Sequence, residues 1–194
     1  MLAPCSFSSE RLVYRAFTFP DDDAFLLDLV RDEATQMGWF GGITRPHSLT
    51  MLESFKKFLE TAPLAVVICI KTEDGQAGQP MGVVDLEKRG PGQHSMCAGF
   101  GLVIHKDHQR KGYGHEAMEW ILRRAFVGHN FHRIQGDVWE WNEPALKIYK
   151  SLGFVLEGRQ RKAVWQEGAW RDNLMLGILR EEWLERHPDA QALQ

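Results

Sequence analysis

The stretch Met96–Ala117, with the sequence MCAGFGLVIHKDHQRKGYGHEA, decides how the rest of the chain is interpreted. Large and small side chains alternate over Met96–Ile104, so this segment is expected to form a strand with one bulky and one nearly bare face. Gly99 and Gly101 lie on the bare face. Glycines inside a strand often mark close approach of a ligand or another backbone, and a closely packed helix over that face is the alternative.

A polar, glycine-containing loop follows this strand and leads into a predicted helix at 112–127. Gly112 and Gly114 let the main chain curl so that successive N–H groups converge, and the helix N-terminus adds donors and partial positive charge. Arg110 and Lys111 add full positive charges. The loop therefore predicts a site that binds a pyrophosphate.

The same glycines also fit the dinucleotide fingerprint G-x-G-x-x-G/A, here Gly112 to Ala117. That motif expects a tight turn between parallel strand and helix and an acid about 20 residues further on, where Asp137 is roughly placed. The polar run His105–Lys111 instead separates the strand from the glycines, and most neighbouring strands are joined as hairpins. Dinucleotide binding is therefore the alternative interpretation of this loop.

A second motif covers Trp141–Phe154. Asn142 suits a helix N-cap and Pro144 suits the first helical turn. Asn142 and Tyr149 are about two helical turns apart, so both lie on one face of the helix with Ala145 between them. Taken alone, the segment is also explained by a capped amphipathic helix with a packed tyrosine.

The order of predicted elements is strand, two helices, three antiparallel strands, helix, strand, helix and two strands. This order predicts an α/β (α+β) fold, with a mixed, mostly antiparallel central sheet of about seven strands and helices on its faces. One domain is expected over 1–194, with its core at about 10–180 and a tail at 181–194 that forms a short exposed helix with a frayed end. The predicted strands are 11–17, 64–70, 81–87, 96–104, 134–139, 154–164 and 170–179.

Composition narrows the class of protein further. A net charge of -3 does not favour nucleic-acid binding, and no apolar run approaches the roughly 20 residues that span a bilayer. Met1–Ser9 lacks a secretory pattern, and three cysteines without metal-type spacing indicate reduced thiols in a cytoplasmic protein. A metal site at His105, His108 and His115 is not expected, because no cysteine or carboxylate supports it in register.

Together the two motifs resemble the GNAT N-acetyltransferases. The matching pattern is Gln109-x-x-Gly112-x-Gly114 and, 30 residues after Gly112, Asn142-x-x-Ala145-x-x-x-Tyr149-x-x-x-Gly153-Phe154. The segments 153–158, 161–162 and Asn173 are similar to the branch that contains the ribosomal-protein N-terminal acetyltransferases. The resemblance extends from Arg11 to Leu179 and is weakest before Leu64, where the family builds its acceptor site.

The resemblance implies that acetyl-CoA lies in a wedge between two splayed parallel strands, here 96–104 and 134–139. It also implies backbone contacts from the end of the first strand to the pantetheine arm, a pyrophosphate held by the loop, and further contacts from the later helix. The implied cofactor-binding residues are Leu102, Val103, Ile104, Gln109, Arg110, Lys111, Gly112, Tyr113, Gly114, Asn142, Ala145, Lys147 and Tyr149.

Acetyl transfer to an amine requires a neutral amine, and the resemblance suggests Tyr149 as the acid for the CoA thiolate. Many relatives carry a glutamate where this chain has Gly99, so the base must lie elsewhere, with Asp85 or Glu140 as the first candidates. Glu87, Glu33, a water chain or a substrate that arrives already deprotonated are the alternatives. The implied acceptor is a small-molecule amine or a peptide N-terminus, for which Trp39, Phe40 and Trp139 are candidate contacts. A ribosomal-type acetyltransferase and an inactive acyl-CoA-binding module are the alternatives, in a monomer or homodimer.

Overall fold

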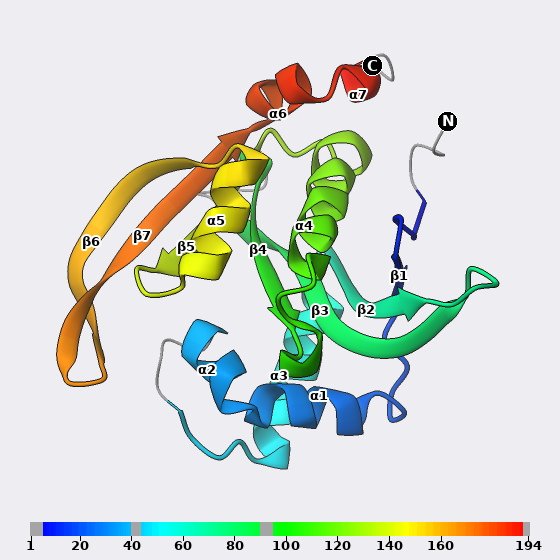
Figure 1. The fold of residues 1–194 in the computed structure, drawn as a ribbon, viewed down its shortest axis with the longest axis vertical. Helices are drawn as coiled ribbons and strands as arrows, with labels where there is room; N and C mark the ends of the chain where they lie inside the picture. The colour runs from blue at the N-terminus through cyan, green and yellow to red at the C-terminus, as the bar shows by residue number, and fades with distance from the viewer. Residues whose placement is uncertain (1–5, 40–43, 90–94, 192–194) are drawn as a thin grey trace. The chain divides into compact units, whose positions relative to one another are not determined.

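The computed structural model of the protein describes residues 6–39, 44–89 and 95–191 (Figure 1). Contacts along the chain divide it into two compact units. Unit 2 consists of Phe7–Asp85 and Gly101–Met118. Unit 1 consists of Met1–Ser6, Leu86–Phe100 and Glu119–Gln194. The expectation of one domain over 1–194 stays a prediction.

Seven strands form one mixed sheet in the order β1-β2-β3-β4-β5-β7-β6. Strand β1 is antiparallel to β2, β7 is antiparallel to β5 and β6, and β4 is parallel to β5. The parallel pair places Cys97 opposite Arg133 and Ala98 opposite Ile134. The predicted mixed sheet is therefore confirmed. Its strands are β1 (Leu12–Arg15), β2 (Leu64–Lys71), β3 (Ala77–Arg89), β4 (Cys97–Ile104), β5 (Arg133–Trp139), β6 (Val155–Gln166) and β7 (Ala169–Leu179).

Two amphipathic helices of unit 2 pack on one face of its strands. The side chain of Ser48 accepts a hydrogen bond from the Met51 backbone N–H at 3.4 Å, so Ser48 is the N-cap that starts α3. Val83 of β3 and Val103 of β4 join the apolar residues of α1 and α3 in one buried cluster. The helices are α1 (Asp23–Arg31), α2 (Glu33–Trp39), α3 (Leu49–Thr61), α4 (Tyr113–Arg123), α5 (Glu143–Leu152), α6 (Arg180–Arg186) and α7 (Pro188–Gln191), and a π-helical turn, Arg124–Gly128, follows α4.

Helix α2 was not expected, because its sequence has no apolar stripe. Its buried side chains are Thr35 and Gln36, and both are polar. The Gln36 side chain donates to the Val30 carbonyl at 3.0 Å and accepts from the Arg45 backbone N–H at 2.7 Å. Hydrogen bonds, not apolar periodicity, therefore fix this helix.

Helix α5 in unit 1 begins at the N-cap that the sequence predicts, and it ends at Gly153. The Asn142 side chain accepts from the Ala145 backbone N–H at 3.3 Å, which caps the first turn. Gly153 at the C-terminal end has a φ of 97°, in the left-handed region that glycine adopts without steric penalty.

The C-terminal segment was expected to be an exposed helix, and this is wrong for α6. Trp183 is fully buried, its ring lies 5.5 Å from that of Phe126, and Leu184 is also buried. An indole supplies a large apolar area, which makes α6 part of the core of unit 1. In the part of the chain that the structure describes, no helix has the length and apolar character needed to cross a membrane.

Candidate acetyl-CoA and amine site

The predicted phosphate loop of unit 2 connects the end of β4 to the start of α4. A 3₁₀ turn, Lys106–His108, comes first, and two left-handed residues follow: Arg110 with a φ of 62° and Gly112 with a φ of 83°. Left-handed residues between right-handed ones turn successive N–H groups toward one side of the chain, which is the geometry of an anion-binding nest. Helix α4 then begins at Tyr113, and its first-turn N–H groups have no partners within the helix. The loop thus fits a pyrophosphate.

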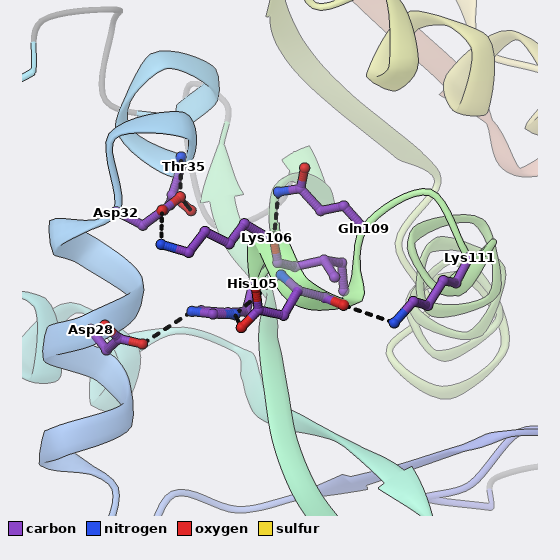
Figure 2. Close-up of polar contacts among 9 residues, drawn as sticks. Asp28, Asp32, Thr35, His105, Lys106, Gln109 and Lys111 are labelled. Carbon is purple, nitrogen blue, oxygen red and sulfur yellow. Dashed lines mark hydrogen bonds and ion pairs between the residues drawn. The ribbon is translucent and has the colours of Figure 1, made fainter.

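Side chains of the loop brace its own main chain (Figure 2). The Gln109 amide donates to the Ile104 carbonyl at 2.8 Å, which closes the turn onto the end of β4. The Lys111 ammonium donates to the Asp107 carbonyl at 2.8 Å. In this arrangement Gln109 shapes the loop, while Arg110 is exposed. Gln109, Arg110 and Lys111 as ligands of the cofactor therefore stay predictions.

A hydrogen bond and an ion pair join the start of this loop to α1 and to the α1–α2 junction (Figure 2). His105 Nε2 lies 3.0 Å from an Asp28 carboxylate oxygen, and Lys106 Nζ lies 3.0 Å from Asp32. Burial acts to raise the pKa of Asp32, but hydrogen bonds from Lys106 and Thr35 outweigh it and lower the pKa. Asp32 is therefore ionised at neutral pH, and its ion pair with Lys106 ties the α1–α2 junction to the loop.

The nearly bare face of β4 is filled by side chains of β3. At Gly101 in unit 2, an added Cβ would lie 2.4 Å from Oδ1 of Asp85. At Gly99 in unit 1, it would lie 2.5 Å from Nε of Arg89. Side chains of the neighbouring strand, which the sequence did not point to, thus fill the space beside these two glycines. Glycine is required at 101 because the Asp85 carboxylate occupies the space of a side chain.

Asp85 is the most deeply buried of the candidate bases, with 1% of its surface exposed. It lies on β3 two residues after Val83, and Gly101 lies on β4 two residues before Val103. Because alternate residues of a strand share a face, the carboxylate lies on the face that α1 and α3 cover. A single acid within the apolar run Met81–Leu86 is the sequence signal for this position.

The place beside Gly99 holds a guanidinium group, not a carboxylate. Arg89 Nη1 lies 3.0 Å from Asp137 Oδ2, and Arg89 also lies 3.5 Å from Glu87. The other oxygen of Asp137 accepts from the Asn173 amide at 3.2 Å. Arg89 was not singled out from the sequence, because its position depends on the register of β3 against β4.

Tyr149 of α5 is buried in an aromatic cluster of unit 1. Its ring centroid lies 5.1 Å from that of Phe100 and 5.6 Å from that of Phe154. Burial raises the pKa of the Tyr149 phenol to about 12. The phenol therefore keeps its proton throughout the physiological pH range and is available as a hydrogen-bond donor.

Glu140, Trp139 and Lys147 are further predicted site residues, and all three belong to unit 1. Glu140 lies 3.7 Å from Arg159, an ion pair that occupies its carboxylate. The rings of Trp139 and Trp141 stack with centroids 5.4 Å apart. Lys147 is exposed on α5.

The predicted residues fall in both units. Leu102, Val103, Ile104 and the loop 109–114 belong to unit 2, as does Asp85, whereas Asn142, Ala145, Lys147, Tyr149, Glu140 and Trp139 belong to unit 1. Trp39 ends α2, but its side chain is outside the described residues, as is the whole of Phe40. Among the described residues, no group of three or more His, Cys, Asp or Glu side chains could hold a metal ion.

Known proteins similar to this chain include named acetyltransferases. The chain is 29% identical over 89 residues to the SPbeta prophage-derived uncharacterized N-acetyltransferase YokL of Bacillus subtilis, covering 46% of this chain and 50% of that protein. It is 28% identical over 90 residues to the spermidine N(1)-acetyltransferase of Escherichia coli, covering 46% and 48%. The chain thus spans about half the length of these curated relatives.

Solved structures share the fold over a longer range. Spermidine N-acetyltransferase from Vibrio cholerae, in complex with CoA and spermine, has a TM-score of 0.74 at 23% identity, covering 91% of this chain and 99% of that one. Residues 11–155 match the acetyltransferase (GNAT) domain. The chain belongs to the GNAT acetyltransferase family, as its two motifs predict. The finer resemblance to the ribosomal-protein branch stays a prediction.

Proposed function

We propose that this protein is an acetyl-CoA-dependent N-acetyltransferase that transfers the acetyl group directly to a primary amine of a small molecule. The observation that carries the proposal is the left-handed, glycine-containing loop before α4, in a chain of the GNAT family. Relatives named spermidine N(1)-acetyltransferases support a small-molecule amine as the acceptor. We expect the enzyme to act in the cytoplasm, where Cys69 and Cys97, both free thiols, would stay reduced.

The residues present fit an acyl-CoA donor, which supplies an activated thioester. Main-chain N–H groups at Gly112–Gly114 and the charges of Arg110 and Lys111 would hold its pyrophosphate. Strand β4 at Leu102–Ile104 would bind its pantetheine arm. Each of these groups binds or orients the donor, and none changes its chemistry.

Asp85 is the residue that we assign to proton removal from the acceptor. A primary amine with a pKa near 10.4 is neutral in only about one molecule in a thousand at pH 7.4, and only the neutral form attacks. Asp85 is buried on the face that α1 and α3 cover, and Gly101 leaves room for its carboxylate. Glu140 is less suited, because Arg159 lies against it.

Tyr149 is assigned a hydrogen bond to the sulfur, not complete proton transfer. Its pKa of about 12 lies well above that of a thiol, near 8.5. Full transfer from phenol to thiolate would be uphill by roughly 5 kcal/mol, at 1.36 kcal/mol per pKa unit. A phenol that keeps its proton still stabilises a developing thiolate through a charge-assisted hydrogen bond.

A binding and turnover experiment tests the proposal. Acetyl-CoA should raise the melting temperature whereas NADH and NADPH should not, and release of free CoA should be measured with spermidine, single amino acids and short peptides as acceptors. Asp85→Asn should lower kcat/KM about 100-fold or more at neutral pH, and the deficit should narrow as rising pH supplies free amine.

Glu87→Gln is the matched control, because Glu87 lies two residues after Asp85 on β3 and its side chain is more exposed. If Asp85→Asn kept full activity, Asp85 would be excluded as the general base. Binding of acetyl-CoA without turnover of any amine would favour an acyl-CoA-binding module, in keeping with Arg89 beside Gly99. A stabilising effect of NADH or NADPH alone would instead favour dinucleotide binding by the same loop.

A further inference from the structure

The side chain of Arg11, from the residue just before β1, lies against the phosphate loop, although the two are about a hundred positions apart in the sequence. Its Nη1 donates to the Lys111 carbonyl at 3.0 Å. Its guanidinium carbon lies 4.7 Å from the centre of the Tyr113 ring, and its Nη2 would lie 3.3 Å from a Cβ at Gly112. Arg11 thus approaches three successive residues of the loop, all within unit 2.

Glu116, in the first turn of α4, holds Arg11 in this position. One carboxylate oxygen accepts from the Arg11 backbone N–H at 2.7 Å and from Ser9 Oγ at 2.7 Å. The other accepts from Arg11 Nε at 2.8 Å. Burial acts to raise the pKa of Glu116, but the hydrogen bonds from Arg11 and Ser9 outweigh it and lower the pKa. The carboxylate is therefore charged at neutral pH, and two of its contacts fix the arginine.

The contact with Lys111 determines which way one main-chain donor points. In a planar trans peptide, the carbonyl oxygen and the following N–H point in opposite directions. Since Arg11 binds the Lys111 carbonyl, the N–H of Gly112 points away from Arg11. With φ at 83°, Gly112 adopts the left-handed backbone that completes the curl of the loop. Arg11 thus binds the carbonyl side of the Lys111–Gly112 peptide. The N–H on the opposite side can then face an anion.

We propose that Arg11 is a positioning residue for the donor, which orients the Gly112 N–H toward the pyrophosphate of acyl-CoA. The inference rests on the proposed function, because it requires that this loop binds a CoA donor. Without the guanidinium, the Lys111–Gly112 peptide would be free to rotate, and one hydrogen bond to a charged phosphate would weaken or disappear. The expected loss is about ten- to hundredfold in affinity for CoA, which is the range for such a bond.

The test compares ligands with and without a pyrophosphate. In Arg11→Met, which keeps an apolar stem, the Kd for CoA measured by calorimetry and the KM for acetyl-CoA should both rise ten- to hundredfold. The kcat/KM for S-acetylpantetheine, which has no pyrophosphate, should stay as in the wild type. Arg11→Lys should recover part of the affinity, because an ammonium can still donate to the Lys111 carbonyl.

Arg15→Met is the control for a general loss of stability. Arg15 is the last residue of β1 and pairs with Asp22 at 2.7 Å, away from the loop. It should lower the melting temperature and leave the Kd for CoA unchanged. If Arg11→Met folds poorly, the amide signal of Gly112 in Arg11→Lys serves instead, and CoA should shift it less than in the wild type.

The outcomes separate this inference from the proposed function. Equal CoA binding by the wild type and Arg11→Met, or an equal loss with CoA and S-acetylpantetheine, would overturn the positioning role alone. No binding of CoA by the wild type would overturn the proposed function and this inference with it.

Discussion

Gly101→Ala adds one methyl group to β4 where the Asp85 carboxylate of β3 packs against it in unit 2. The new carbon would lie 2.4 Å from Oδ1 of Asp85, whereas an ordinary contact is about 3.5 Å. The carboxylate must therefore move by about 1 Å. A displacement of this size at a catalytic group can lower the rate about 100-fold, and overpacking of this kind costs about 1–3 kcal/mol.

The assays for Gly101→Ala are thermal unfolding and turnover of acetyl-CoA with the best amine from the screen. For a chain of this size, a cost of about 2 kcal/mol lowers the melting temperature by about 4–8 °C. We expect kcat to fall about 100-fold, with KM for acetyl-CoA little changed, because the phosphate loop is untouched. Gly99→Ala is the matched control: its methyl meets the flexible Arg89 side chain, which can move toward solvent.

A double-mutant cycle ties the effect to Asp85. In an Asp85→Ala background the added methyl at 101 has space, so the stability cost of Gly101→Ala should largely disappear. The reasoning would be refuted if Gly101→Ala cost the same with and without Asp85. It would also be refuted if Gly101→Ala kept the wild-type melting temperature and kcat.

Three further predictions follow from other groups. Tyr149→Phe should lower kcat about tenfold or more at every pH from 6 to 9, because a phenol with a pKa of about 12 does not titrate there; an unchanged kcat would reduce Tyr149 to packing. The stability lost in Glu116→Gln, measured by urea unfolding, should be complete at pH 7 and shrink as pH falls below about 4.3, because the folded pKa of Glu116 is lowered; a pH-independent difference would contradict this. Trp183→Ala should destabilise the protein by about 3–5 kcal/mol in the same assay, whereas an exposed tail would tolerate it.

The phosphate loop and helix α5 could be predicted because their signals are local. Gly112 and Gly153 stand where the chain takes a left-handed conformation, and Asn142 caps the helix that it precedes. Each of these roles is set by a residue and its immediate neighbours. The sheet order follows from the same local elements, because short connections join antiparallel neighbours.

The parts that could not be predicted depend on residues far apart in the sequence. Helix α2 is held by the hydrogen bonds of Gln36, which leave no periodic pattern. In the sequence, Asp85 is one of several acids that could lie at the surface. Only the pairing of β3 with β4 places Gly101 beside it. Arg11 gave no signal at all, because its partners are fixed only by the pairing of β1 within the sheet and the position of α4.

The link between Arg11 and Glu116 also affects how the protein is made. It closes a loop across 105 positions. The entropic cost of closing a loop of this length is about 4 kcal/mol, which the contacts formed afterwards must offset. During synthesis, the first strand has left the ribosome long before its partner helix exists. Under the proposed function, the nucleotide end of acetyl-CoA would therefore have no braced binding loop on a nascent chain shorter than about 116 residues, and the ligand would stabilise only chains in which both segments have met. Donor binding would thus report that the segments of Arg11 and Glu116 have met.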